Sequence, residues 1–376
     1  MWPRTSWMVG CLLASWLGAA EPLALYLNYT GDPRHTVSVL WHQPAGEEAF
    51  PFQVRLVGQG QWVAGASKTK VWDPAKRDVH CVRLTGLSPG ARYEFRFGEE
   101  EKSYTFRTVP DPTKACVKFA VGGDMRCEWR PSKFRSMAKA VAEEEPHFVV
   151  AGGDLAYCRG RANAWPRWEV WLREWQDLMV TAKGDLIPVV PVLGNHEVDG
   201  GYGQERTAAP HFFALFDFPD DSPIRALDIG TALSLLLLDS GHCHAVAGAQ
   251  TEWLQAALSQ RRTQAFRCAV YHVPAYACRD ASSTKSAEVR KHWAPVLEKE
   301  EVEVAFEHHH HALKRTKPLK HGEPAVRGTI YLGDGSWGVP PRAIERESFR
   351  ELMEFSAAEN GCWIAEVMGK KMVLRA

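Results

Sequence analysis

The stretch Gly153-Asp154-Leu155-Ala156-Tyr157 directly follows an apolar run, His147-Phe148-Val149-Val150-Ala151. The run has the length and composition of a buried strand, and the glycines after it indicate a tight turn. This turn presents a carboxylate at Asp154 and, three residues later, a phenol at Tyr157. Both are oxygen donors suited to hard metal ions, although Gly-Asp after a strand is also ordinary loop chemistry. A metal site here requires further ligands from elsewhere in the chain.

Such ligands follow other apolar runs of the sequence. Each of these side chains comes directly after a predicted strand: Asp124, Asn195, His196, Glu197, His272, and the histidines His308, His309, His310 and His311. In open α/β sheets, ligands bind in the crevice at the carboxyl ends of the strands. Five strand ends that each carry metal-binding side chains therefore predict one shared metal site.

Each of these residues also has a purely structural explanation. Asp124 suits a helix cap, and Asn195 suits a turn with Gly194. A lone His196 or His272 is more often a hydrogen-bonded core histidine than a ligand. The four-histidine run is also compatible with a loop that sequesters metal loosely. All of these explanations must hold together for the site to be absent, so the joint pattern favours the site.

The surrounding pattern predicts two domains after an N-terminal leader. Residues 21–112 contain alternating strands, and Leu87-Ser88-Pro89-Gly90 before Tyr93 fits the tyrosine corner of β-sandwiches. This region resembles a fibronectin type III-like domain, expected to act as a scaffold, the rim of a cleft or a homodimer contact. Residues 113–376 alternate strands with helices, expected over residues 131–144, 165–179 and 251–261, and end in a hairpin. That alternation predicts a layered α/β domain with a largely parallel central sheet.

Composition narrows the choice of partners. The chain has 376 residues, and its 45 Lys and Arg balance 45 Asp and Glu. It therefore offers no electrostatic reason to expect a nucleic acid or an anionic membrane as partner.

The first residues predict export from the cell. Residues 1–20 combine a positive start, an apolar run and the small residues Gly18-Ala19-Ala20, as in a signal peptide cleaved after Ala20. The rival interpretation is a retained anchor helix, but the apolar run is short for a bilayer. Secretion, extracellular or periplasmic, would place eight remaining cysteines in an oxidising compartment, with Cys127–Cys158 the first pair to test.

The ordered blocks resemble those of the calcineurin-like metallophosphoesterases and, within them, the purple acid phosphatases. The blocks are Gly123-Asp124, Gly153 to Tyr157, Gly194 to Glu197, Ala269 to His272, and His308 to His311. The resemblance covers nearly the whole chain after the leader, because larger members also place a β-sandwich before the catalytic domain. It implies an αββα sandwich with mixed sheets for residues 113–376.

The resemblance also implies a dinuclear centre bridged by Asp154. One ion, expected to be Fe(III), would take Asp124, Tyr157 and His311. The second, a divalent Fe, Zn or Mn, would take Asn195, His272 and His309. His196 would lie near the substrate and give a proton to the leaving group.

Three positions depart from the family pattern. Arg126 stands where glycine is common, either facing the phosphate or merely solvated, and Ala269 replaces a valine. His308 replaces a glycine, so the ligand pair is His309 with His311 or, in the other register, His308 with His310. The spacing to Lys314-Arg315 favours His309 and His311.

The function expected from this resemblance is a secreted acid phosphatase that hydrolyses small phosphate monoesters by attack of a metal-bound hydroxide on phosphorus. A phosphodiesterase or nucleotide pyrophosphatase on the same metal core is one alternative. A secreted binding protein with a vestigial metal site is the other.

Overall fold

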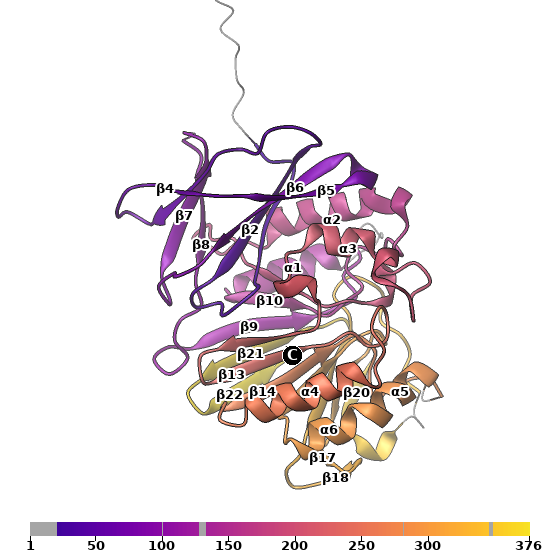
Figure 1. Cartoon of the computed structure of the whole chain (residues 1–376). Coiled ribbons are helices and arrows are strands. Elements are labelled where there is room, and N and C mark those ends of the chain that lie inside the picture. Colours follow the sequence, from indigo (N-terminus) through magenta and orange to yellow (C-terminus); the bar gives the residue numbers. More distant parts are fainter. Residues whose placement is uncertain (1–20, 100, 128–132, 281, 346–348) are drawn as a thin grey trace, which may run out of the picture.

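The computed structural model describes residues 21–99, 101–127, 133–280, 282–345 and 349–376. Two β-sheets stack face to face with helices outside them, and an antiparallel β-region adjoins one end (Figure 1). This architecture confirms the predicted fold class, a β-sandwich followed by an α/β domain of αββα type. The leader, residues 1–20, lies outside the described residues. Among the described helices, none has the length and apolar composition of a membrane span.

The N-terminal region is built from antiparallel strands. They are β1 (Leu25–Asn28), β2 (Val37–Pro44), β3 (Phe52–Leu56), β4 (Val63–Gly65), β5 (Lys68–Trp72), β6 (Arg77–Leu84), β7 (Arg92–Phe97) and β8 (Tyr104–Arg107). One sheet has the order β4-β3-β7-β8, and it faces the group β1-β2-β6-β5. The Ser88 backbone N–H donates to the Tyr93 hydroxyl at 2.9 Å, the bond of a tyrosine corner.

The N-terminal strands do not form a separate module. Strand β1 pairs in parallel with β11 (Val189–Pro191) through Asn28 and Val189, which joins the two regions in one sheet of nine strands. Strand β2 is also buried on both faces, and its Ser38 hydroxyl donates to Asp217 at 2.8 Å on the side away from the sandwich core. The alternation of apolar and polar residues along a strand shows only which of its faces are buried. It cannot show that strands of two regions belong to one sheet.

The α/β region has two mixed sheets instead of the single, largely parallel sheet that the strand pattern predicts. The first continues through β9 (Val117–Gly122), β10 (Phe148–Ala151), β11, β21 (Trp363–Met368) and β22 (Lys371–Arg375). The second contains β12 (Arg225–Ile229), β13 (Leu233–Leu237), β14 (Phe266–Tyr271), β15 (Val304–Glu307), β19 (Ile330–Asp334), β16 (Leu313–Thr316) and β20 (Met353–Ala357). A short hairpin, β17 (Leu319–Lys320) with β18 (Glu323–Pro324), lies apart from both. Each large sheet is parallel at its centre and antiparallel toward its edge, and the two bury their inner faces against each other.

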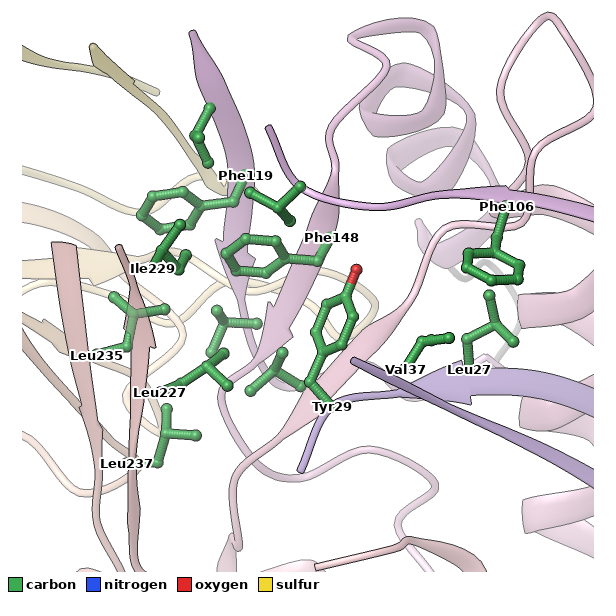
Figure 2. Packing of buried hydrophobic residues seen from close by; sticks show 14 of the residues in the cluster. Leu27, Tyr29, Val37, Phe106, Phe119, Phe148, Leu227, Ile229, Leu235 and Leu237 are labelled. Carbon is green, nitrogen blue, oxygen red and sulfur yellow. The ribbon is translucent and has the colours of Figure 1, made fainter. Parts of the chain in front are cut away.

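Apolar side chains from both sheets fill the space between them. Figure 2 shows Phe119 and Phe148 from the first sheet facing Ile229, Leu235 and Leu227 from the second. The two phenylalanine rings stack with centroids 5.1 Å apart. This apolar layer fixes the distance between the sheets, and so it also fixes the distance between the loops at their carboxyl ends.

Helices cover the outer faces. They are α1 (Phe134–Glu143), α2 (Trp165–Leu178) and α3 (Pro210–Leu215) on the first sheet, and α4 (Ala249–Gln260), α5 (Thr284–His292) and α6 (Ala294–Lys299) on the second. Helix α2 buries Trp168, Trp171, Leu172 and Trp175, whose spacing of three and four residues places them on one face. The predicted helices correspond to α1, α2 and α4, and the predicted hairpin is β21–β22. Pro131, the expected start of α1, lies outside the described residues.

The structure records no disulfide between Cys127 and Cys158. Instead, the Cys158 sulfur is buried and accepts a hydrogen bond from the Trp168 indole N–H at 3.1 Å. The pairing that the sequence suggests first is therefore not made here.

Candidate metal centre

The predicted metal-binding residues converge at the carboxyl ends of strands from both sheets. Asp124 and Asp154 follow β9 and β10, and Asn195 follows β11. His272 directly follows β14, and the four histidines directly follow β15. Because the sheets face each other, five loops that are distant in sequence meet at one place.

Several of these residues have an unusual backbone. Asp124, Asp154, Tyr157, His309 and His311 all have positive φ, between 51° and 67°. Residues other than glycine rarely adopt this left-handed conformation, and it persists only where surrounding contacts hold it. Here the two aspartate loops hold each other, since the Asp124 N–H donates to Gly153 at 3.0 Å and the Met125 N–H to Asp154 at 2.8 Å.

One group of donors surrounds Asp124. Its Oδ1 lies 2.8 Å from His311 Nε2 and accepts a hydrogen bond from the Tyr157 hydroxyl at 2.9 Å. The Tyr157 hydroxyl is also 3.4 Å from His311 Nε2. A carboxylate, a phenol and an imidazole thus point at one place.

A second group surrounds His272. Its Nε2 lies 3.3 Å from Asp154 Oδ2, 3.2 Å from Asn195 Oδ1 and 3.2 Å from His309 Nδ1. Its Nδ1 is 2.9 Å from the Gly152 carbonyl, which fixes the ring orientation. One donor atom each from Asp154, His272 and His309 lies within 4.8 Å of the others, a spacing that suits one cation.

The four histidines alternate in direction. His309 and His311 contribute to the two groups above, whereas His308 packs beneath the loops and His310 is buried with its Nδ1 unpartnered among the described residues. His308 Nδ1 lies 3.0 Å from Asp334 Oδ2. Its ring occupies the space next to Gly152, where a Cβ would come within 1.9 Å of Nε2. The glycine at position 152 is therefore required by the histidine that stands where the family pattern has a glycine.

Glu197 supports the site without pointing into it. Its buried carboxylate accepts backbone N–H groups from Asp154 at 2.7 Å, Leu155 at 2.8 Å and Gly194 at 3.0 Å. It thereby ties the loop after β10 to the loop after β11. The sequence pattern groups Glu197 with the metal-binding residues, but the structure gives it this positioning role.

Tyr202 is a neighbour of the site that no sequence pattern indicates. Its hydroxyl lies 3.5 Å from His309 Nε2, on the side of the ring away from His272. It comes from a loop with no motif, so only the folded structure places it here.

His196 and Arg126 line a cavity beside the two groups. The cavity has a volume of about 790 Å³, and Tyr157 and His311 also line it. The His196 ring stacks on Tyr157 with centroids 4.1 Å apart, and its Nε2 is 3.8 Å from Asp154 Oδ2. The Arg126 guanidinium lies 6.0 Å from the centroid of the Tyr157 ring.

The electrostatics of these groups suit cations. Burial opposes ionisation of Asp154, but the neighbouring His272 and His196 outweigh it and bring the pKa of Asp154 to about 2. Burial alone would lower the pKa of His272, yet Asp154 and Asp124 raise it to about 10. Burial and the two aspartates raise the pKa of the Tyr157 phenol well above its usual value. A phenolate here therefore needs a strongly Lewis-acidic ion.

The donor set itself fits metal ions. Asp124 and Asp154 are almost completely buried, and within the described parts of the chain neither forms an ion pair with a lysine or arginine. Buried carboxylates need paired charges or metal ions. Carboxylate, phenol, amide and imidazole donors are ligands of iron, zinc and manganese.

Comparison with known proteins agrees with this arrangement. Residues 22–108 match the family "Purple acid Phosphatase, N-terminal domain", and residues 117–335 match "Calcineurin-like phosphoesterase". Similar proteins include purple acid phosphatase 21 of Arabidopsis thaliana, 24% identical over 68% of this chain and 58% of that protein. An uncharacterized protein of Mycobacterium tuberculosis is 23% identical over 87% of this chain and 72% of its own length. The chain thus spans less than two thirds of the Arabidopsis relative.

A solved structure shares the fold. The purple acid phosphatase PPD1 from seeds of yellow lupin (Lupinus luteus) superposes with a TM-score of 0.75 at 16% identity. The match covers 93% of this chain and 71% of the lupin chain.

Proposed function

The chain belongs to the purple acid phosphatase family of calcineurin-like phosphoesterases, and on that premise we propose that it hydrolyses phosphate monoesters at a dinuclear metal centre. One observation carries the proposal: two groups of donor side chains, around Asp124 and around His272, lie side by side at the meeting edges of the two sheets.

In this proposal the two groups hold different ions. Asp124, Tyr157 and His311 would hold Fe(III), for which a phenolate is a suitable ligand. Asn195, His272 and His309 would hold a divalent Fe, Zn or Mn ion, and Asp154 would serve both ions. When bound, such ions polarise phosphate oxygens and lower the pKa of coordinated water.

The protein's own groups orient the ester and supply a proton. His196 lines the cavity between Tyr157 and Asp154, where its imidazole is placed to hydrogen-bond the phosphoryl group. Water adds to phosphorus as the P–O bond to the leaving group breaks, and protonated His196 gives its proton to the departing alkoxide. The products are the alcohol and inorganic phosphate. Arg126 lies on the same wall, where its guanidinium can hold a phosphate oxygen.

Location outside the cytoplasm is part of the proposal. It is supported by the leader-like residues 1–20 and is tested by N-terminal sequencing of the exported protein, which should begin at Glu21.

The direct test compares an aryl phosphate monoester with the matching diester on purified, metal-loaded protein from acidic to neutral pH. We expect the monoester to be hydrolysed faster, and Asp154→Ala to lose the activity. Faster hydrolysis of the diester would favour a phosphodiesterase on the same metal core. Absence of hydrolysis, or equal activity in Asp154→Ala, would favour a binding protein with a vestigial site.

A further inference from the structure

The cavity beside the metal centre is strongly basic. Besides Tyr157, His196 and His311, five arginines line it: Arg126, Arg159, Arg161, Arg167 and Arg342. No aspartate or glutamate is among the lining residues in the described part of the chain. The chain as a whole has a formal net charge of zero, so this concentration of positive charge is local.

Three of these arginines lack a carboxylate partner among the residues that the structure describes. Arg159 and Arg161 make no side-chain hydrogen bond or ion pair with any described residue, and Arg342 donates only to the His309 carbonyl at 3.4 Å. Arginines elsewhere on the surface are commonly neutralised, as Arg173 is by Glu169 at 2.7 Å and Arg262 by Glu300 at 2.9 Å. The cavity therefore holds cationic groups whose charge the described protein does not balance.

The backbone fixes these arginines to the metal-binding loops. The Arg159 N–H donates to the His196 carbonyl at 2.6 Å, and Arg159 itself has a positive φ of 54°. The Arg161 N–H donates to the Cys158 carbonyl at 3.2 Å, and the Arg342 N–H donates to the His311 carbonyl at 2.9 Å. Each arginine is thus anchored within two residues of, or directly on, a residue of the candidate site.

We propose that the substrate is a small molecule with at least two phosphate groups, and that Arg159, Arg161 and Arg342 bind the phosphate that is not being cleaved. This inference rests on the proposed hydrolase function. Arg126 and the metal centre suffice for one phosphoryl group, and Arg167 donates to the Tyr157 carbonyl at 2.6 Å. Three further guanidinium groups remain for a second phosphate. Guanidinium forms strong, directional hydrogen bonds to phosphate. The volume of about 790 Å³ lies within the range of small-molecule sites, which favours a compact polyphosphate over a protein chain.

The test uses two phosphate monoesters that differ in one phosphate, fructose 6-phosphate and fructose 1,6-bisphosphate, on the metal-loaded full chain. We expect kcat/KM for the bisphosphate to exceed that for the monophosphate by about tenfold or more at low salt, since one well-placed charged hydrogen bond is worth that factor. The excess should shrink as salt is added, because the cavity is open to solvent. In the double variant Arg159→Gln/Arg161→Gln the ratio of the two kcat/KM values should fall about tenfold, mainly through KM. Arg173→Gln/Arg262→Gln, which replaces the same number of arginines outside the cavity, should keep the ratio.

Each outcome decides between explanations. Equal kcat/KM for both sugars in the wild-type protein, or an unchanged ratio in the double variant, would overturn the inference while leaving the monoesterase proposal intact. An acidic phosphopeptide preferred over the bisphosphate would also overturn it, in favour of a phosphoprotein substrate. Absence of turnover of the monophosphate and of an aryl phosphate would instead refute the proposed function itself.

Discussion

The variants His309→Ala and His310→Ala distinguish the two possible ligand pairs of the histidine run. These pairs are His309 with His311 and His308 with His310. The structure places His309 Nδ1 3.2 Å from His272 Nε2, in the group that also contains Asp154. His310 is the adjacent residue, with its ring centroid 5.3 Å from that of His309, but its Nδ1 has no partner among the described residues. His310 is buried and His309 only partly buried, so His310→Ala disturbs packing at least as much as His309→Ala. A larger loss of metal in His309→Ala therefore reports metal binding.

The expected loss of metal affinity follows from the number of ligand side chains in the group around His272. Removing a residue that only orients a ligand costs metal sites about 10–100-fold in affinity. His309 is one of four donors in its group, with Asp154, Asn195 and His272, so its loss should cost at least about 100-fold, or about 2.7 kcal/mol. His310→Ala should change affinity less than about threefold.

The assay is metal content by mass spectrometry after dialysis against a graded series of chelator concentrations. His309→Ala should lose one ion at much lower chelator concentration than the wild-type protein. Equal losses in the two variants, or a larger loss in His310→Ala, would refute the register described here.

Three further changes test the supporting structure. Glu197→Gln should lower the free energy of unfolding by about 1–3 kcal/mol in urea titrations. The NH₂ group of the glutamine side chain would face at least one of the three backbone N–H groups that the carboxylate now accepts. An unchanged free energy of unfolding would contradict the positioning role. Asp217→Asn should cost about 1–2 kcal/mol at pH 7, since Arg83 and Ser38 outweigh burial and hold the pKa of Asp217 below its usual value. This deficit should vanish as pH falls through that lowered pKa, where the wild-type carboxyl is also protonated, and a deficit independent of pH would count against the charge argument. Burial lowers the pKa of His42 to about 3, so the unfolded state binds the proton first and stability falls as pH drops below about 6.5. His42→Gln should remove about 2 kcal/mol of the difference in unfolding free energy between pH 7 and pH 5, and an unaltered difference would show that His42 is protonated in the folded state.

The sequence predicts the main elements of the fold because their patterns are local. Helix α2 has its tryptophans at helical spacing, and the turn before Tyr93 forms the expected corner. The division into two sheets and the pairing of Asn28 with Val189 are set by contacts between distant segments, which leave no periodic signal. The short helices α3, α5 and α6 have too few residues for a clear pattern.

The position of the site is predictable for a similar reason. Strand ends are visible in the sequence, and parallel strands bring their carboxyl ends to one edge, so the sequence alone groups Asp124, Asp154 and His272. The direction in which a loop side chain points is not predictable in this way. The spacing to Lys314-Arg315 favours His309 over His308. The direction itself is set by positive φ values and by the space beside Gly152, which no sequence pattern shows.

The central claim is a dinuclear centre in which Tyr157 binds Fe(III), and metal content combined with a visible spectrum tests it most directly. After reconstitution with iron and zinc, we expect two ions per chain and a visible absorption band that is lost in Tyr157→Phe. Tyr202→Phe is the matched control, since that hydroxyl lies 3.5 Å from His309 Nε2 outside the ligand set, and it should keep the band. One ion or none per chain, or a band that survives Tyr157→Phe, would contradict the account.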